Sequence, residues 1–237
     1  MHNLTFANTL LKRLPPSTIA RLNLHRVDLP RGRDLAVIGE RIQCLCFLEQ
    51  GIGSMTTCFE NGAQVEVSMF GYESVIGVSA LMGVKQSLNR VFMQLAGTGY
   101  TCNLQTAFVE FESNAYFRGL MLRFVQAQLT LAMQNAACNS SHSYEQRLAR
   151  WLLICSERAA QDTLELPQEF VAEMLGSTRS TVSIAAAHLK AKRLIDYSRG
   201  HIRLIDKRGL EAESCECYRV VRNHLESFAQ FDTEFVT

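Results

Sequence analysis

The chain has 237 residues and a formal net charge of +1, with 47% hydrophobic and 20% charged residues. This composition is typical of a globular protein, and the length is sufficient for two domains with separate cores. Four Lys and Arg residues interrupt the first thirty positions, and no stretch approaches twenty uninterrupted apolar residues. The sequence therefore predicts neither an export signal nor a membrane span.

The N-terminal third has the pattern of a β-domain. Residues 4–24 predict a short helical lead-in, and residues 27–104 contain short alternating runs separated by turn signals. Asn61-Gly62 is the strongest hairpin signal among them. Such spacing favours a jelly roll, within a predicted domain of residues 1–112. We expect strands at 27–29, 43–48, 54–59, 65–70, 90–94 and 99–104, with Gln50-Gly51 as one of the turns.

The period changes from about Ser113, where a long helix is predicted to run to about Asn139. One apolar seam follows Phe117, Leu120, Phe124, Ala127 and Leu131, and a neighbouring seam follows Leu122, Val125, Leu129, Ala132 and Ala136. A helix that is apolar on two adjacent faces must bury both. We expect one face to pack on the β-domain and the other on a symmetry mate, which makes residues 113–140 a dimerisation helix. A second helix is predicted from Ser143 through Ala160.

Residues 166–205 predict a winged helix-turn-helix, within a domain of residues 141–206. Pro167 suits the start of a helix, Gly176 suits a left-handed helix end, and Thr178 can cap the next helix. Two short strands around Arg199-Gly200 form the predicted wing. A generic two-helix packing unit with a hairpin is the alternative. The local charge opposes that alternative, because residues 174–203 contain six Lys and Arg residues and a single acid.

The outer face of the second helix carries hydroxyl groups, an arginine and small side chains, which can approach base edges in the major groove. We therefore predict that the domain binds double-stranded DNA. The predicted DNA-binding residues are Gln168, Ser177, Thr178, Arg179, Ser180, Thr181, Ser183, Ile184, Arg199 and His201.

With a jelly roll, a long helix and a winged helix-turn-helix in that order, residues 4–206 resemble the Crp/Fnr superfamily of bacterial transcription regulators. The most specific matches are Gln168–Ser183 and the helix that starts at Ser143. The resemblance implies an α+β fold with a cyclic-nucleotide-binding-like β jelly roll. It also implies a homodimer that reads a palindrome and that has RNA polymerase as a partner. Arg179 matches an arginine that the family sets against guanine, whereas Ser180 stands where glutamate is frequent, and Ile184 replaces a later arginine. Arg199 and His201 would contact the DNA backbone.

The β-domain departs from the pattern of the cyclic-nucleotide members. These members have a Gly-Glu step and an Arg-Ser or Arg-Thr pair, where this chain has Ile76-Gly77-Val78-Ser79 and Leu88-Asn89-Arg90-Val91. We therefore do not expect dependence on cyclic AMP, and Gly77, Ser79 and Arg90 are the candidate effector-binding positions. Residues 1–40 lack the cysteines of an iron–sulfur member, and His25 is the only candidate axial haem ligand in the jelly roll beyond the N-terminal region. No cofactor is predicted.

The eight cysteines, without an export signal, favour a reducing cytoplasm. Cys44-x-Cys46 and Cys215-x-Cys217 do not have the spacing of a structural zinc site, so no metal ligands are predicted. They are interpreted either as core residues or as a thiol sensor. The tail of residues 207–237 has helical composition, and is interpreted as a buttress of the DNA-binding domain or as a redox- or metal-responsive patch.

Three functions compete at this point. The first is a homodimeric transcription regulator, whose effector would be redox chemistry or a small ligand held by the apolar residues 65–81 and 92–95. The second is a regulator whose β-domain has a filled core and has lost its ligand. The third is a cupin-like enzyme, which would need two or three converging histidines and a carboxylate. His25 alone cannot supply that set, and catalytic motifs are lacking, so no catalytic residue is predicted.

Overall fold

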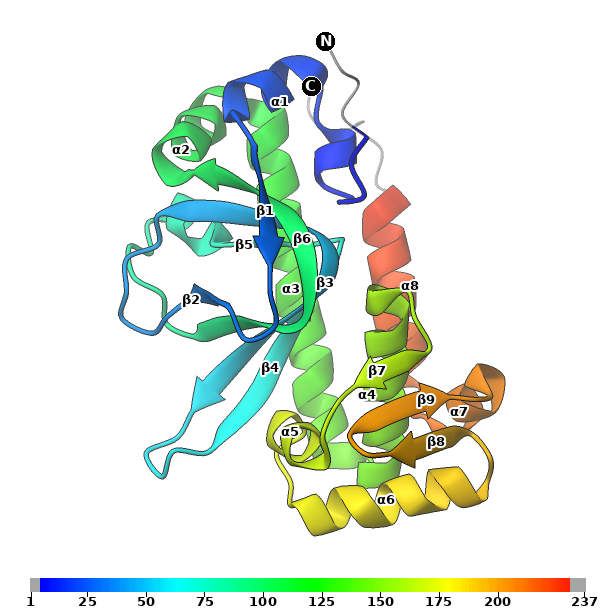
Figure 1. Cartoon of the computed structure of the whole chain (residues 1–237). Helices are drawn as coiled ribbons and strands as arrows, with labels where there is room; N and C mark the ends of the chain where they lie inside the picture. The colour runs from blue at the N-terminus through cyan, green and yellow to red at the C-terminus, as the bar shows by residue number, and fades with distance from the viewer. Residues whose placement is uncertain (1–4, 231–237) are drawn as a thin grey trace. The chain divides into compact units, whose positions relative to one another are not determined.

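The computed structural model describes residues 5–230, with side chains as far as His224. Residues 1–4 of the predicted domain 1–112, and residues 231–237 of the predicted tail, lie outside the described residues. The described chain forms two compact units. The first comprises residues 5–55, 69–129 and 225–230, and the second comprises residues 56–68 and 130–224. The α+β fold is confirmed, with a β-rich N-terminal part, a long helix and a C-terminal helix-turn-helix region (Figure 1).

The predicted helical lead-in is confirmed over its described residues. A 3-10 turn, η1 (Leu11–Arg13), precedes helix α1 (Pro16–Leu22). Proline is tolerated at a helix start because that position needs no N–H donor. Leu10, Leu11, Leu14 and Leu22 are buried in the core of the first unit. The lead-in thus adds apolar side chains to the β-domain.

The N-terminal strands form a sheet with the order β1-β6-β3-β4, in which β2 pairs with β6 and β5 pairs with β3. The predicted hairpin at Asn61-Gly62 is confirmed between β3 and β4, and Gly62 has a φ of 82°. A short turn, η2 (Val78–Met82), follows β5. The strands are β1 (His25–Leu29), β2 (Asp34–Ala36), β3 (Cys44–Cys58), β4 (Gln64–Phe70), β5 (Val75–Ile76) and β6 (Arg90–Asn103).

The predicted turn at Gln50-Gly51 is wrong, because β3 runs straight through it. Gly51 has a φ of 86°, and a Cβ there would lie 2.7 Å from the carbonyl oxygens of Leu95 and Ala96. A Cβ on Gly97 would lie 1.9 Å from the carbonyl oxygen of Gln50. These glycines allow two backbones to approach closely rather than turn. The predicted strands 90–94 and 99–104 are likewise one strand, β6.

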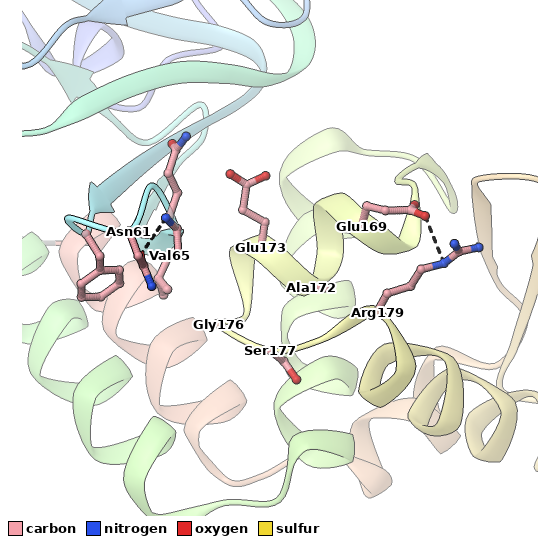
Figure 2. Close-up of a pocket in the computed structure, with 11 residues that line it drawn as sticks. Asn61, Val65, Glu169, Ala172, Glu173, Gly176, Ser177 and Arg179 are labelled. Carbon is pink, nitrogen blue, oxygen red and sulfur yellow. Dashed lines mark hydrogen bonds and ion pairs between the residues drawn. The ribbon is translucent and has the colours of Figure 1, made fainter.

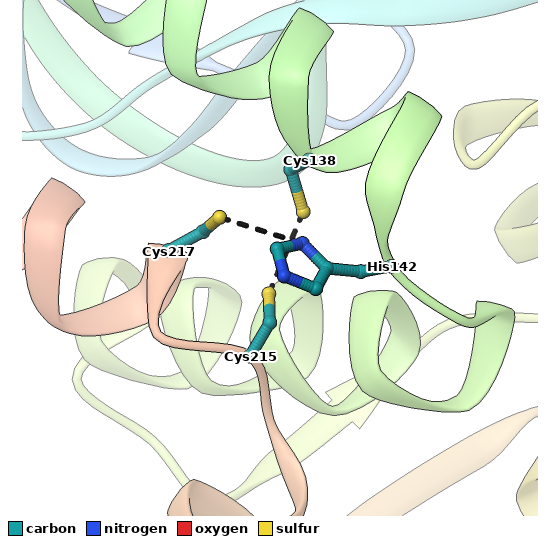
Figure 3. A group of neighbouring side chains, drawn as sticks. All are labelled: Cys138, His142, Cys215 and Cys217. Carbon is teal, nitrogen blue, oxygen red and sulfur yellow. Dashed lines mark hydrogen bonds between the residues drawn. The ribbon is translucent and has the colours of Figure 1, made fainter.

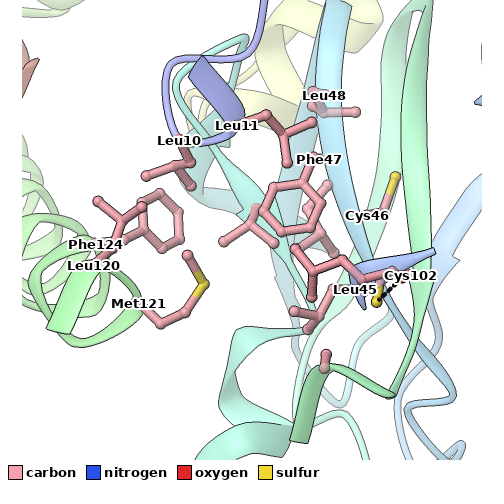
Figure 4. Packing of buried hydrophobic residues seen from close by; sticks show 14 of the residues in the cluster. Leu10, Leu11, Leu45, Cys46, Phe47, Leu48, Cys102, Leu120, Met121 and Phe124 are labelled. Carbon is pink, nitrogen blue, oxygen red and sulfur yellow. Dashed lines mark hydrogen bonds between the residues drawn. The ribbon is translucent and has the colours of Figure 1, made fainter. Parts of the chain in front are cut away.

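Apolar side chains of the sheet and of the long helix meet in the core of the first unit (Figure 4). Phe47 of β3 is fully buried. Leu120, Met121 and Phe124 of the long helix each expose 1% of their surface or less. These side chains lie with Leu10 and Leu11 in one cluster. The first apolar seam of the helix is therefore a core seam, as predicted.

The long helix predicted from about Ser113 to about Asn139 is confirmed as α3 (Ala115–Ser141), and a shorter helix that was not predicted precedes it. Helix α2 (Leu104–Ser113) starts directly after β6, about ten residues before the predicted start, and Asn114 separates it from α3. The Asn114 side chain accepts a hydrogen bond from the backbone N–H of Tyr116 at 3.0 Å, which caps the new helix. The second predicted seam is largely exposed: Leu122 and Leu129 expose 45% and 54% of their surface, Ala132 and Ala136 are also exposed, and Val125 is half-buried. Met133, beside this seam, exposes 56%.

The second unit begins its helical part with α4 (Tyr144–Ala159), whose start at Ser143 is confirmed by a capping box with Gln146. A small sheet has the order β7-β9-β8. Among the described residues, no helix combines the length and apolar character needed to cross a bilayer. The remaining elements are β7 (Thr163–Glu165), α5 (Gln168–Met174), α6 (Arg179–Ala191), β8 (Ile195–Ser198), β9 (His201–Leu204), α7 (Lys207–Glu213) and α8 (Cys217–Gln230).

Candidate DNA-binding surface

The predicted turn between α5 and α6 has the expected backbone. Gly176 has a φ of 60°, the left-handed conformation that glycine adopts without steric penalty. Its N–H donates to the Glu173 carbonyl at 3.2 Å, and the Ser177 N–H donates to the Ala172 carbonyl at 2.8 Å. This pair of bonds is a Schellman helix end. Pro167 lies at the N-cap of α5, one residue before its predicted place.

Helix α6 begins as the sequence predicts. The Thr178 hydroxyl accepts a hydrogen bond from the backbone N–H of Thr181 at 3.3 Å, which satisfies one of the free donors of the first turn. Val182, Ala185 and Leu189 are buried on one face of α6, opposite the buried side chains of α5. The apolar stripe therefore determines which side of α6 packs against α5 and which side is exposed to solvent.

The free side of α6 carries most of the predicted contact residues. Thr178, Arg179 and Ser180 are exposed at its start, while Ser177, Thr181 and Ser183 are half-buried. Ile184 exposes 60% of its surface in the middle of the helix. Its side chain adds an apolar group to a face that otherwise carries mainly hydroxyl groups and an arginine.

Two of the predicted contact side chains are held by neighbours on α5. The Arg179 guanidinium forms an ion pair with Glu169, with 3.0 Å between Nε and Oε1 (Figure 2). The Ser183 hydroxyl donates to the Gln168 side chain at 2.7 Å. Sequence reasoning did not foresee either contact, because α5 and α6 meet only in the folded domain.

The wing is a two-residue hairpin. Asp196 pairs with Arg203 and Ser198 pairs with His201 across β8 and β9. Arg199 and Gly200, between them, have φ values of 50° and 82°, which matches the turn type favoured in tight hairpins. Arg199 and His201 are exposed, as a backbone-contacting wing requires. A third strand, β7, pairs with β9 and was not predicted, because its three residues give too short an alternation to read.

A hollow of about 450 Å³ lies between the wing and the helix-turn-helix. Gln168, Glu169 and Arg179 line one side of this hollow, and the wing residues 197–200 line the other. Burial raises the pKa of Tyr197 to about 12, so the phenol is neutral at physiological pH. Its hydroxyl donates to the Leu166 carbonyl at 3.1 Å and thereby ties the wing to the start of α5. The structure thus brings predicted contact residues of α5, α6 and the wing together.

Acidic side chains from other segments reduce the basic character of this region. Lys192 contacts Glu213 at 2.6 Å and Glu145 at 3.4 Å. Lys190 contacts Asp196 at 2.8 Å, and this lysine lowers the pKa of the aspartate. These pairs are exposed and therefore weak, so phosphates can displace them. Among the described residues, Arg193 and Arg199 make no ion pair.

A second hollow, of about 630 Å³, lies between α5 and the tip of the β3–β4 hairpin (Figure 2). Asn61 and Val65 come from the hairpin, and Ala172 and Glu173 come from α5. In the same unit the Trp151 indole N–H donates to Glu66 at 2.9 Å. The hairpin tip therefore belongs to the surroundings of the helix-turn-helix, which the strand pattern alone did not indicate.

The candidate effector positions belong to the first unit. Gly77 has a φ of 90°, and a Cβ there would lie 2.6 Å from the Cys44 carbonyl oxygen, so its role in the fold is steric. Ser79 is half-buried in η2. Arg90 forms a 2.8 Å ion pair with Asp34, and its guanidinium carbon lies 4.5 Å from the centre of the Phe92 ring. Within residues 5–230, no hydrogen bond or ion pair joins Arg90 to Gly77 or Ser79.

Comparisons with known proteins agree with this geometry. Residues 146–213 match the model of the Crp-like helix-turn-helix domain. The chain is 26% identical over 199 residues to the global nitrogen regulator of Synechococcus elongatus, which covers 79% of this chain and 89% of the relative.

Two solved structures share the fold. A structure from Eubacterium rectale, assigned to the Crp/Fnr family, has a TM-score of 0.69 at 16% identity and covers 89% of this chain and 97% of its own. FixK2 from Bradyrhizobium japonicum has a TM-score of 0.70 at 14% identity, and covers 82% and 98%. Residues 146–213 thus match a Crp-like helix-turn-helix domain, and the chain shares the fold of solved Crp/Fnr-family structures.

Proposed function

We propose that the protein is a homodimer that reads a palindromic DNA operator with the exposed face of α6 and with the wing. The observation that carries the proposal is the exposed side of α6, where Arg179 and Ile184 stand free of the core on a helix whose other face is fully packed. Two such helices one DNA turn apart would read two half-sites, and this gives an affinity that one helix alone lacks.

Each contact residue has a role in this proposal. Arg179 hydrogen-bonds a guanine, and Ile184 touches a thymine methyl group. Gln168, Ser177 and the hydroxyls around Thr178 contact phosphates near the start of α6, where the backbone N–H groups also favour negative charge. Arg199 and His201 contact the sugar–phosphate backbone from the wing. The operator would keep one guanine contact of the familiar half-site and differ elsewhere.

The dimer interface would be the exposed apolar seam of α3. Leu122, Leu129 and Met133 lie one or two helical turns apart on the side opposite the buried seam. In a parallel pair of helices the same seam serves both partners, as a two-fold interface requires. The proposed division of the chain is then a sensor-like domain (1–112), a dimerisation helix (113–140), a DNA-binding domain (141–206) and a helical tail (207–237).

The β-domain would not respond to cyclic AMP. A buried phosphate needs a positioned positive charge, and Arg90 already pairs with Asp34 and stacks on Phe92. A regulator of this kind would act in the cytoplasm, where free thiols persist, and would have RNA polymerase as its partner. We propose no enzymatic activity, since His25 is the only described histidine of the β-domain.

The test is selection of binding sites from a randomised DNA pool, with salt titration and with arms that add reductant or cyclic AMP. The expected result is a palindrome with half-sites one helical turn apart, unchanged by cyclic AMP. A change caused by the reductant alone would favour a thiol sensor. Purely sequence-independent, salt-sensitive binding in every arm would contradict the proposed reading helix.

A further inference from the structure

Four side chains with metal-binding chemistry meet in the second unit, away from the DNA-binding surface (Figure 3). Cys138 and His142 lie four positions apart at the end of α3. Cys215 and Cys217 flank Glu216 at the junction of α7 and α8. One ligand atom of each residue lies within 4.8 Å of the other three. The three cysteines are buried and His142 is half-buried.

The spacing of these atoms fits a common central cation. In a tetrahedral zinc site, bond lengths of about 2.3 Å to sulfur and 2.0 Å to nitrogen place neighbouring sulfurs about 3.8 Å apart, and sulfur and nitrogen about 3.5 Å apart. The Cys138 and Cys215 sulfurs are 3.5 Å apart, and the Cys217 sulfur is 3.6 Å from His142 Nδ1. Bonded disulfide sulfurs would be only about 2.05 Å apart.

The neighbours of the four side chains are those that orient metal ligands. The other ring nitrogen of His142, Nε2, lies 3.2 Å from the Glu216 carboxylate, which fixes Nδ1 as the free lone pair. Such carboxylate–histidine pairs are a common second shell of metal sites. Gln134 donates its side-chain N–H to the Cys217 sulfur at 3.0 Å, a contact that favours a thiolate.

A nearby positive charge suits the net charge of such a centre. A divalent ion with three thiolates and a neutral imidazole carries one negative charge, which is unfavourable in a buried place unless it is balanced. Arg150 of α4 is buried in the same unit as the four side chains. Its Nη1 donates to Asn135 at 2.7 Å, so the guanidinium is held in position.

We propose that Cys138, His142, Cys215 and Cys217 bind one Zn²⁺ ion in a closed tetrahedral site. Four protein ligands leave no open position, so the role is structural rather than catalytic. Binding releases the three thiol protons to solvent and involves no oxidation. The ion would join the end of α3 to the α7–α8 junction. The sequence did not reveal this site, because each half supplies only two ligands and neither has Cys-x-x-Cys spacing.

The first measurement is the metal content of the intact protein, purified under reducing conditions without chelator and supplied with Zn²⁺. One Zn²⁺ per chain is expected after dialysis. Replacement by Co²⁺ should give the intense visible bands of tetrahedral coordination and a thiolate charge-transfer band. Zinc-free protein after this treatment, or a Co²⁺ spectrum of six-coordinate type, would overturn the proposal.

Variants locate the site. Cys215→Ser should lose the bound metal, whereas Cys58→Ser and Cys155→Ala, at cysteines outside the cluster, should retain it. Glu216→Gln keeps all four ligands and should weaken Zn²⁺ binding by about ten- to a hundredfold, because only the partner of His142 changes. This exposed substitution tests the site even if Cys215→Ser does not fold. Equal metal retention by Cys215→Ser and Cys58→Ser would contradict the assignment, as would a mass lower by two hydrogens from a Cys138–Cys215 disulfide.

Discussion

In the absence of DNA, the Arg179 guanidinium forms an ion pair with Glu169. Both side chains of this pair are largely exposed. An exposed pair of this kind contributes only about 0–1 kcal/mol. The proposed exchange of Glu169 for a guanine edge would therefore cost little, while the pair holds the Arg179 side chain near the start of α6. The same acid also repels phosphates, so its effect on DNA affinity is unfavourable.

Replacement of Arg179 should separate base reading from general attraction. Arg179→Ala is expected to weaken operator binding by about 1–3 kcal/mol and to relax the preference at one base pair. Glu169→Gln serves as the matched control, and should strengthen binding because it removes the competing carboxylate. Binding titrations on the selected operator and on single-base variants would measure both. Uniform weakening across all sequences would contradict the assignment of Arg179 to a base.

Arg199 allows a test of the wing that leaves its shape intact. Asparagine tolerates the left-handed conformation of this turn, so Arg199→Asn should remove a charge without unfolding the hairpin. If Arg199 contacts one phosphate, the slope of log affinity against log salt should fall in magnitude by about 0.9. Lys85→Asn, at an exposed loop position of the first unit, should leave the slope unchanged. An unchanged slope for Arg199→Asn would remove this residue from the interface.

At the scale of elements, α1 and α2 are joined by a bidentate pair. Arg21 donates from Nε and Nη2 to the buried carboxylate of Glu110, at 2.7 Å and 2.6 Å. The hydrogen bond from Arg21 holds the pKa of Glu110 below its usual value of about 4.5. The pair therefore stabilises the fold above that usual value, and the contribution is lost as pH falls through the lowered pKa.

Glu110→Gln should consequently be less stable than the natural protein at neutral pH, and the difference should shrink as the pH falls below about 4. Denaturant unfolding of both proteins at several values between about pH 3 and 7, which span the usual carboxyl pKa, would measure the difference in the free energy of unfolding. Glu40→Gln, at an exposed position, is the control and should show little difference at any pH. A constant difference between Glu110→Gln and the natural protein would assign the effect to packing rather than to charge.

Local signals and long-range contacts explain which elements were predictable. The cap at Thr178, the left-handed Gly176 and the Arg199-Gly200 turn are encoded by a few adjacent residues, and all three are confirmed. The sequence predicted a turn at Gly51 because glycine is common where φ is positive. A positive φ also occurs inside a strand, as it does at Gly51. In the structure Gly51 lies against the Leu95 and Ala96 carbonyl groups of another strand, and no local pattern indicates that approach. The ligand cluster was missed for the same reason, since Cys138 and Cys215 meet only in the folded chain.

At the scale of the whole molecule, the exposed seam of α3 should control assembly. Leu129→Glu places a charge on that seam, and in the proposed dimer two-fold symmetry would double its effect. We expect the dimer to weaken by at least about a hundredfold, or roughly 3 kcal/mol. Leu88→Glu, at a position that exposes 76% of its surface in another region, is the control and should remain dimeric. Sedimentation across a concentration series would measure this, and an unchanged dimer would exclude the seam as the interface.

Cys138 and Cys215 also mark the two ends of a segment. They lie 77 positions apart, and residues 146–213, the complete helix-turn-helix domain, lie between them. If Zn²⁺ joins these ends, as proposed, it closes that domain into a ring. By chain-entropy reasoning, closing a loop of this length disfavours the unfolded chain by about 4.5 kcal/mol. During synthesis the ring can close only after its last ligands leave the ribosome, so a prematurely terminated chain would display the DNA-reading helix without this closure.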